Sequence, residues 1–179
     1  KAGIKLEDVN KIAVTEKPGL QGCLLVGLAF AEAVGLFYKK EVVKINHIHG
    51  HIFSTFLKSY EGVEILEDLP TLPAICLVVS GGHTQLHLVK KEGNFYKIKL
   101  LGETLDDAAG EAFDKSSRIL GFSSYKLGGA LLSKNALNGK VVKDLKLPRP
   151  VLNTKGLEFS FSGLKSAVMR TLPLVEKGL

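Results

Sequence analysis

Three histidines, His47, His49 and His51, lie within five positions of this chain, and imidazole is a common metal ligand. On a strand all three would share one face, whereas on a helix only His47 and His51 would, one turn apart. The apolar residues of the stretch 52–57 recur at helical spacing, and Asn46 is a good N-cap at the end of an apolar run. The sequence therefore predicts an i, i+4 histidine pair on a first helical turn. An ordinary surface or core histidine pair remains the alternative.

The histidine stretch lacks the glutamate that a metallopeptidase would need. The two-histidine zinc motif of metallopeptidases needs a glutamate directly after the first histidine as general base. Ile48 stands in that place, so the spacing argues against a peptidase.

The stretch "VVSGGHTQ" predicts a strand, a Gly81-Gly82 turn and a second strand. Successive backbone N–H groups in such a turn can bind an anion, and glycine lets a phosphate approach the backbone closely. An ordinary hairpin is the alternative. Ser80, His83 and Thr84 favour a binding role, because they place more polar chemistry around the turn than a turn needs.

The next candidate is "GETLDDAAGEAFDKSSRILG". Its Thr104 and Asp107 fit a capping box, and its charged residues recur at helical spacing on one stripe: Asp107, Glu111, Asp114 and Arg118. Such a stripe is either a solvated face or a source of carboxylates that accept hydrogen bonds from sugar hydroxyls. "LGGALLSKNA" then brings a second Gly-Gly pair into a helix, which suits either an anion at the helix N-terminus or close helix packing.

Alternating elements must position these groups. A strand at 11–15, a helix at 21–38 and a strand at 41–45 predict a βαβ unit with parallel strands. After a variable connector at 58–73, the apolar run "AICLVVS" is typical of a central strand. "TQLHLVKK" and "NFYKIKLLG" complete an antiparallel meander. Helices are then predicted at 105–120, 128–138 and about 161–173, with a loop at "KLPRPVLNTKG".

Composition sets broad limits. The chain has 179 residues, 45% of them hydrophobic, and a net charge of +6 that suits an acidic partner such as RNA. Cys23 and Cys76 lie in apolar runs, which predicts buried free thiols in a reducing compartment. The longest apolar run contains Glu32 and is shorter than the roughly 20 residues of a membrane span, so no membrane segment is expected. The first and last residues read like the inside of longer elements, so we expect a fragment with both ends missing.

Taken in order, "PGLQG", "NHIHGH", "VSGGHTQL", "GETLDDAAGEAFDK", "LGGALLSK", "PRP" and "FSFSGLK" resemble the TsaD family, of the bacterial or organellar type. This is the family of tRNA adenosine threonylcarbamoyltransferases, once named O-sialoglycoprotein endopeptidase or glycoprotease. The resemblance implies an α/β fold of the actin, sugar kinase and Hsp70 type, in which mixed sheets flanked by helices form two lobes. We expect residues 1–72 to be the remainder of the first lobe, and residues 73–179 to begin the second.

The resemblance also implies a site. One divalent metal, iron or zinc, would bind His47 and His51, with His49 as a neighbour. A third ligand, an aspartate, would lie outside this chain, because no aspartate follows Asp144. Threonylcarbamoyl-adenylate, ATP or ADP would contact a set given by the family motifs: Val78, Val79, Ser80, Gly81, Gly82, Asp114 and Gly129. His83, Thr84 and Glu111 would support it.

The implied reaction is attack by the N6 amine of the adenine beside the tRNA anticodon on the carbamoyl carbon, with AMP leaving. Expected partners are tRNA, a paralogous TsaB-type subunit, a TsaE-type ATPase or a second copy of the chain, in the cytoplasm or an organellar matrix. The chain departs from the family at Lys17, where a glycine is usual, and at "LGGA", where the usual form is P-G-G-P. A non-catalytic scaffold subunit, a metallopeptidase and another carbamoyl transfer remain alternatives, and this chain alone is expected to be inactive.

Overall fold

The computed structural model describes residues 3–55, 72–122, 128–140, 145–151 and 155–176. The chain forms two compact units, Lys1–Pro70 and Thr71–Leu179, and each is described by itself. The predicted connector at 58–73 lies almost entirely outside the described residues.

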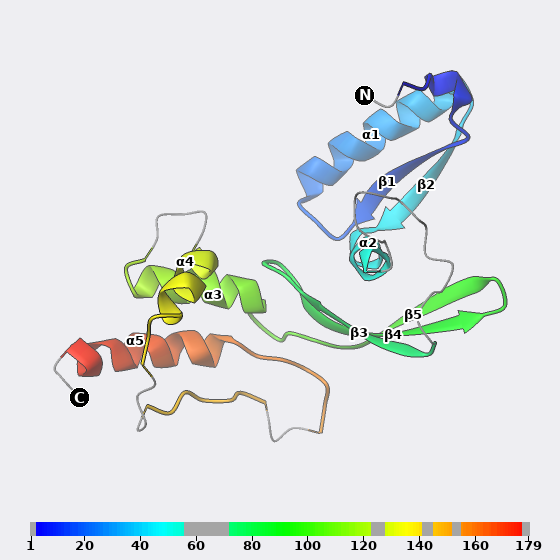
Figure 1. The fold of residues 1–179 in the computed structure, drawn as a ribbon. Coiled ribbons are helices and arrows are strands. Elements are labelled where there is room, and N and C mark those ends of the chain that lie inside the picture. Colours follow the sequence, from blue (N-terminus) through cyan, green and yellow to red (C-terminus); the bar gives the residue numbers. More distant parts are fainter. Residues whose placement is uncertain (1–2, 56–71, 123–127, 141–144, 152–154, 177–179) are drawn as a thin grey trace. The chain divides into compact units, whose positions relative to one another are not determined.

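The first unit is built on a βαβ arrangement, as the sequence predicts. After a short 3-10 helix, η1 (Leu6–Asp8), the strands β1 (Lys11–Lys17) and β2 (Glu41–Asn46) pair in parallel. Helix α1 (Gln21–Tyr38) connects them and lies along both strands, and helix α2 (His47–Ser54) begins directly after β2 (Figure 1). The histidines therefore follow the carboxyl end of a parallel strand, where ligand sites gather in α/β folds.

Helix α1 packs closely on one side only. Ala31 and Gly35 are its buried residues, and a Cβ on Gly35 would lie 2.5 Å from Val42 Cγ2, so glycine allows the close approach to β2. The other side exposes large apolar side chains: Leu25, Val26, Phe30, Leu36 and Phe37. By length and composition alone, α1 is the one helix of the described residues that could cross a membrane. A helix that connects two parallel strands, and that other elements cover on both faces, is equally long and apolar. Length and composition therefore do not distinguish the two.

The second unit opens with an antiparallel meander of β3 (Ala74–Val79), β4 (Thr84–Glu92) and β5 (Phe95–Glu103). The strand order is β3-β4-β5, so the predicted central strand is wrong for the described sheet: β3 lies at its edge and β4 lies in the middle. The apolar run alone suggested a strand buried on both faces. In the described residues, however, Ile75, Leu77 and Val79 are more than half exposed.

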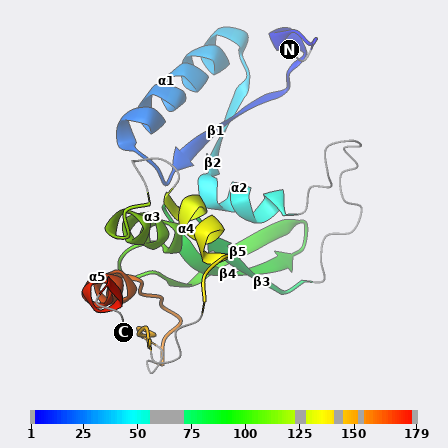
Figure 2. The same ribbon diagram turned by 60° about the vertical axis from the view of Figure 1, so that its left-hand side comes forward.

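Three helices follow, α3 (Ala109–Ile119), α4 (Gly128–Ala136) and α5 (Ser162–Glu176). Helices α3 and α4 lie side by side, and α5 packs on α3 (Figure 2). Buried alanines line this packing, Ala112 on α3 and Ala167 on α5. The "PRP" segment forms no helix or strand in its described residues, as predicted.

The predicted start of the first of these helices is wrong. Residues 105–108 are not helical, the N-cap of α3 is Ala108, and no side chain caps it. Thr104 does not form a capping box with Asp107. Instead it continues the sheet by an isolated parallel bridge to Phe159. The Thr104 hydroxyl still bonds locally, but it donates to the Asp107 carbonyl at 2.8 Å and does not cap the helix. The sequence spacing does not reveal the pairing with Phe159.

Both cysteines differ from the prediction of buried thiols. Cys23 is exposed on α1 and Cys76 is half-buried on β3, and both are free. Burial raises the pKa of the Cys76 thiol. Their apolar neighbours in sequence suggested burial, but those neighbours lie on surfaces that the described residues leave open.

Candidate functional site

The histidine stretch forms a helix, as the sequence predicts. The Asn46 side chain accepts a hydrogen bond from the Ile48 N–H at 2.8 Å, and it therefore caps α2. The helix places His47 and His51 on one face. Their Nε2 atoms lie 3.1 Å apart, and their rings meet at 69° with centroids 4.4 Å apart.

This geometry suits two ligands of a shared cation. Two imidazole nitrogens bound to one tetrahedral zinc at about 2.0–2.1 Å lie roughly 3.3 Å apart. The pair is exposed on the helix, so a third ligand could reach it. Within the described residues no group of three or more histidines, cysteines and carboxylates converges. The described residues therefore present two imidazoles that could serve as ligands, and a third ligand would come from elsewhere.

His49 is two residues from each histidine of this pair, so helical periodicity places it on another face of α2. Burial lowers the pKa of His49, and the positive charge of Lys17 lowers it further. Lys17 is the residue that departs from the family pattern. Its ammonium group therefore acts on the histidine that is not expected to bind the metal.

The glycine turn joins β3 to β4, and Ser80 organises it. Ser80 N–H donates to the His83 carbonyl at 2.8 Å, and Ser80 Oγ accepts from the N–H groups of Gly82 and His83 at 3.3 and 3.0 Å. Of the two glycine amides expected to hold phosphate, that of Gly82 thus has an acceptor already. The amide of Gly81 has none among the described residues, and a Cβ added to either glycine would meet nothing within 4 Å.

Helix α3 begins against this turn. Gly110 N–H donates to the Ser80 carbonyl at 3.1 Å, and Ala109 N–H donates to Thr84 Oγ1 at 2.9 Å. A Cβ on Gly110 would lie 2.8 Å from both Gly81 Cα and the Ser80 carbonyl oxygen, closer than real side chains approach. Glycine at position 110 is therefore what lets the first turn of α3 reach the glycine turn.

Asp114 lies one helical turn after Gly110, on the same face of α3. Its Oδ1 accepts the Gly129 N–H at 2.8 Å, at the start of α4. Two residues that the family motifs put in one site, Asp114 and Gly129, are thus in direct contact. Glu111 pairs with Lys115 at 2.8 Å and is half-exposed, which fits the charged-face alternative for this residue.

Sequence reasoning missed the role of the two adjacent aspartates before α3. Asp106 accepts hydrogen bonds from Ser160 Oγ and from the N–H groups of Phe161 and Ser162, ahead of and at the start of α5. Burial opposes ionisation of Asp106, but these hydrogen bonds, with one from the Asp107 N–H, lower its pKa overall.

Asp107 is the second of these aspartates; it precedes α3 and does not lie on a solvated face, which was one of the two alternatives for the charged stripe. Its side chain is only 13% exposed, and it pairs with Lys115 of α3 and, at 3.3 Å, with Lys165 of α5. The hydrogen bond from Lys115 is the main cause of a lowered Asp107 pKa, with Lys165 adding to it against the effect of burial. The two aspartates therefore connect the segment before α3 with α5. The sequence alone does not predict these contacts, because the "FSFSGLK" motif that supplies the partners is more than 50 residues away.

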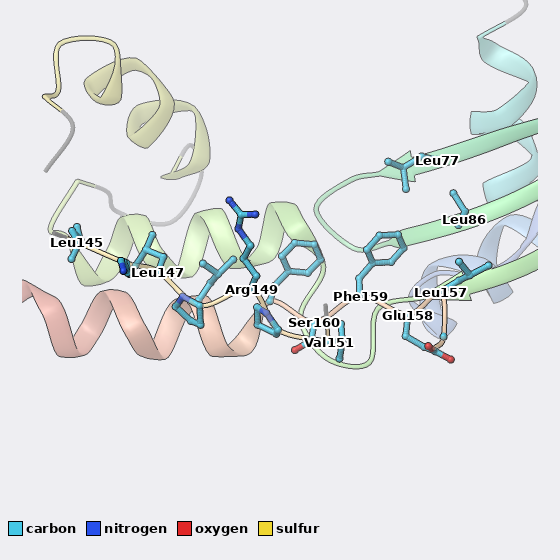
Figure 3. A pocket seen from close by; sticks show the side chains of 16 residues that line it. Leu77, Leu86, Leu145, Leu147, Arg149, Val151, Leu157, Glu158, Phe159 and Ser160 are labelled. Atoms are coloured by element: carbon cyan, nitrogen blue, oxygen red, sulfur yellow. The ribbon is translucent and has the colours of Figure 1, made fainter. Parts of the chain in front are cut away.

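A cavity of about 1190 Å³ in the second unit was also not predicted. Leu77 and Leu86 lie on its strand side, Arg149 lies on its loop side, and Phe159 lies between them (Figure 3). Most of its wall is apolar. The "PRP" and "FSFSG" motifs both contribute residues to this wall, so both motifs help to form the cavity.

The first unit thus presents a helix-borne imidazole pair directly after a parallel strand, and the second unit presents a glycine turn against which a helix begins. Both are features of an α/β protein that binds ligands at strand ends. Comparison with known proteins is specific. The family model for tRNA N6-adenosine threonylcarbamoyltransferase, TsaD, matches residues 1–177. The chain therefore belongs to the TsaD family.

Individual relatives carry the same name. The tRNA N6-adenosine threonylcarbamoyltransferase of Acidovorax sp. (strain JS42) is 47% identical over 168 residues, covering 94% of this chain and 44% of the relative. That of Syntrophomonas wolfei is 48% identical over 161 residues, covering 90% and 43%. That of Thermosipho africanus is 43% identical over 176 residues, covering 98% and 49%. The chain thus spans somewhat less than half the length of these relatives.

Proposed function

We propose that the protein carrying this chain transfers the threonylcarbamoyl group from threonylcarbamoyl-adenylate to the N6 amine of the adenine beside the tRNA anticodon. The observation that carries the proposal is the arrangement along one face of α3. Gly110 touches the glycine turn there, and Asp114 contacts Gly129 one helical turn later. Family membership and the names of the relatives support the same reaction.

In this proposal the adenylate lies against the glycine turn, between Val78 and Gly82. The Gly81 N–H has no acceptor among the described residues and can donate to the phosphate, and no side chain projects from Gly81 or Gly82. Asp114 has a second carboxylate oxygen beyond the one that Gly129 occupies, and that oxygen can accept from a ribose hydroxyl. His83 and Thr84 support the turn, since Thr84 Oγ1 anchors the start of α3.

His47 and His51 would hold one divalent metal, iron or zinc, with an aspartate from elsewhere in the protein as third ligand. Such a metal stabilises developing oxyanion charge on a carbonyl group. The amine of the tRNA base forms the new N–C bond at the carbamoyl carbon, the C–O bond to the adenylate phosphate breaks, and AMP leaves with that electron pair. The attacking amine loses one proton to water, so that the new urea linkage is neutral.

We also propose that the two units belong to the two lobes of an actin-like ATPase fold, and that the protein acts in the cytoplasm or an organellar matrix. A TsaB-type subunit and a TsaE-type ATPase are the proposed partners. The packing of α1 on the strands of its own βαβ unit supports a helix of a soluble lobe over a membrane span.

A transfer assay tests the function. The protein, at the full length that its gene encodes and with its partners, receives threonylcarbamoyl-adenylate and unmodified tRNA, and the nucleosides are analysed by mass spectrometry. We expect modified adenosine from the parent, and at least a tenfold lower rate from Asp114→Ala. Glu41→Ala, which removes an exposed ion pair with Lys11, is the matched control and should keep the parent rate. If the parent forms no product but still binds its partners, the protein is a scaffold subunit.

A further inference from the structure

We propose that one face of the β4–β5 hairpin, the face carrying Lys90, Lys97 and Lys99, binds the sugar-phosphate backbone of the tRNA. This inference rests on the proposed function, which supplies a polyanionic substrate, and it locates a contact surface for that substrate. The face is called the lysine face below.

The register of the hairpin puts these lysines on one side. Lys90 pairs with Lys97 directly across the two strands, and Lys99 pairs with Leu88 two positions further along β5. Residues directly opposite each other point to the same face, and so do residues two positions apart on one strand. Lys91 pairs with Tyr96 and therefore points to the opposite face.

The lysines repel one another, and the hairpin itself compensates little of that repulsion. Like charges placed directly across two antiparallel strands destabilise the pairing. Glu92 pairs with Lys97 at 3.2 Å, but both side chains are more than half exposed, so this pair contributes little. Lys90 and Lys99 are exposed and form no ion pair among the described residues. An anionic partner would turn this unfavourable arrangement into a favourable one.

The spacing on the lysine face suits a nucleic-acid backbone. Lys97 and Lys99 are two residues apart on a strand that rises about 3.3 Å per residue, so their side chains can reach successive phosphates. Phe95 lies at the end of the same face, opposite Glu92, and it is 79% exposed. An exposed aromatic ring beside lysines can stack on an unpaired base, which is a common element of RNA recognition.

The charge arrangement thus favours RNA over a protein as the occupant. The ammonium groups of Lys90 and Lys99, without an ion pair among the described residues, and that of Lys97, weakly paired with Glu92, attract a polyanion but do not select its shape. That is the usual property of a surface that positions a nucleic acid and does not read its sequence.

The test measures tRNA binding by the full-length protein over a series of salt concentrations. Removing one lysine that neutralises a phosphate lowers the slope of log K against log salt by about 0.7–0.9. We therefore expect Lys90→Ala/Lys99→Ala to lower the slope by about 1.5 and to raise Kd. Lys91→Ala, on the opposite face, should leave both unchanged. Glu92→Gln should tighten binding, because it frees Lys97. Circular dichroism establishes that each variant is folded.

Three results would overturn the inference, and together they separate it from the proposed function. If the parent modifies tRNA but the double variant binds like Lys91→Ala, the lysine face is not a contact and the function stands. If the double variant binds tRNA normally but loses its ATPase partner, the occupant is a protein. A parent that neither binds nor modifies tRNA overturns the function and the inference together. If the lysine face binds tRNA, the double variant should have a higher KM for tRNA than the parent and the same kcat.

Discussion

Asp106 accepts the backbone N–H of Phe161 at 2.8 Å, across a separation of 55 residues. The same oxygen accepts the N–H of Ser162, the first residue of α5, at 3.3 Å. The helix thus receives its N-terminal acceptor from a residue far away in the sequence. This carboxylate also lies where negative charge is favourable, at the positive end of the helix dipole.

Replacing Asp106 with alanine should lower the free energy of unfolding by about 1–2 kcal/mol, since a cap and its charge-assisted hydrogen bonds are removed. Urea unfolding followed by circular dichroism measures this change. Glu92→Ala removes an exposed carboxylate and should cost less than about 1 kcal/mol. Equal midpoints for the two variants would show that Asp106 does not stabilise α5.

Asp107 should make the second unit sensitive to acid. Its folded-state pKa is lowered by Lys115 and then by Lys165, so its stabilising effect is complete above the unfolded pKa, about 3.9. That effect is lost as the pH falls through the folded pKa. Asp107→Asn lacks this titration, so its stability should fall less than that of the parent between about pH 5 and pH 3. Parallel slopes of stability against pH would contradict this assignment.

Gly110→Ala should disturb the glycine turn. Alanine favours helix by up to about 1 kcal/mol over glycine, but its methyl group would meet Gly81 Cα and the Ser80 carbonyl. We expect lower thermal stability and at least tenfold weaker binding of an adenine nucleotide, measured by calorimetry. Gly22→Ala in α1 is the control for stability, because open space surrounds Gly22 and the same helix propensity applies. A Gly110→Ala protein as stable as this control, with normal nucleotide affinity, would mean that α3 can shift without cost.

Metal binding should depend on His47 and His51 but not on His49. His47→Ala and His51→Ala should each lose most zinc or iron in equilibrium dialysis of the full-length protein, because their Nε2 atoms converge. His49→Ala, on the same helix, should retain it. Loss of metal in all three variants would indicate unfolding of α2 and not removal of ligands, and a helical circular dichroism spectrum distinguishes the two.

The histidine site was the most predictable part of the molecule. Its helix, its Asn46 cap and the convergence of His47 and His51 all depend on residues within one short stretch. Local spacing is sufficient there, because the cap and the pair are formed by neighbours in sequence. The parallel pairing of β1 and β2 also follows from the helix between them.

The acidic stretch shows where local reasoning fails. Thr104 and Asp107 match a capping box, yet Thr104 joins Phe159 and Asp107 pairs with Lys115 and Lys165. Both partners at the far end belong to the "FSFSGLK" region, more than 50 residues later. A motif defined by sequence spacing considers only hydrogen-bond partners within a few residues. It cannot include partners that only tertiary packing brings close.

Strand β3 carries a further consequence for handling the protein. Its sequence, "AICLVV", has six apolar residues without a charge, and it lies at the edge of the described sheet with alternate side chains exposed. Uncharged, β-prone segments at an open edge template the growth of cross-β aggregates. Pro73 directly before the strand is the kind of gatekeeper that limits such growth. During synthesis, the solubility of the protein should therefore depend on how soon another segment or a chaperone covers this edge.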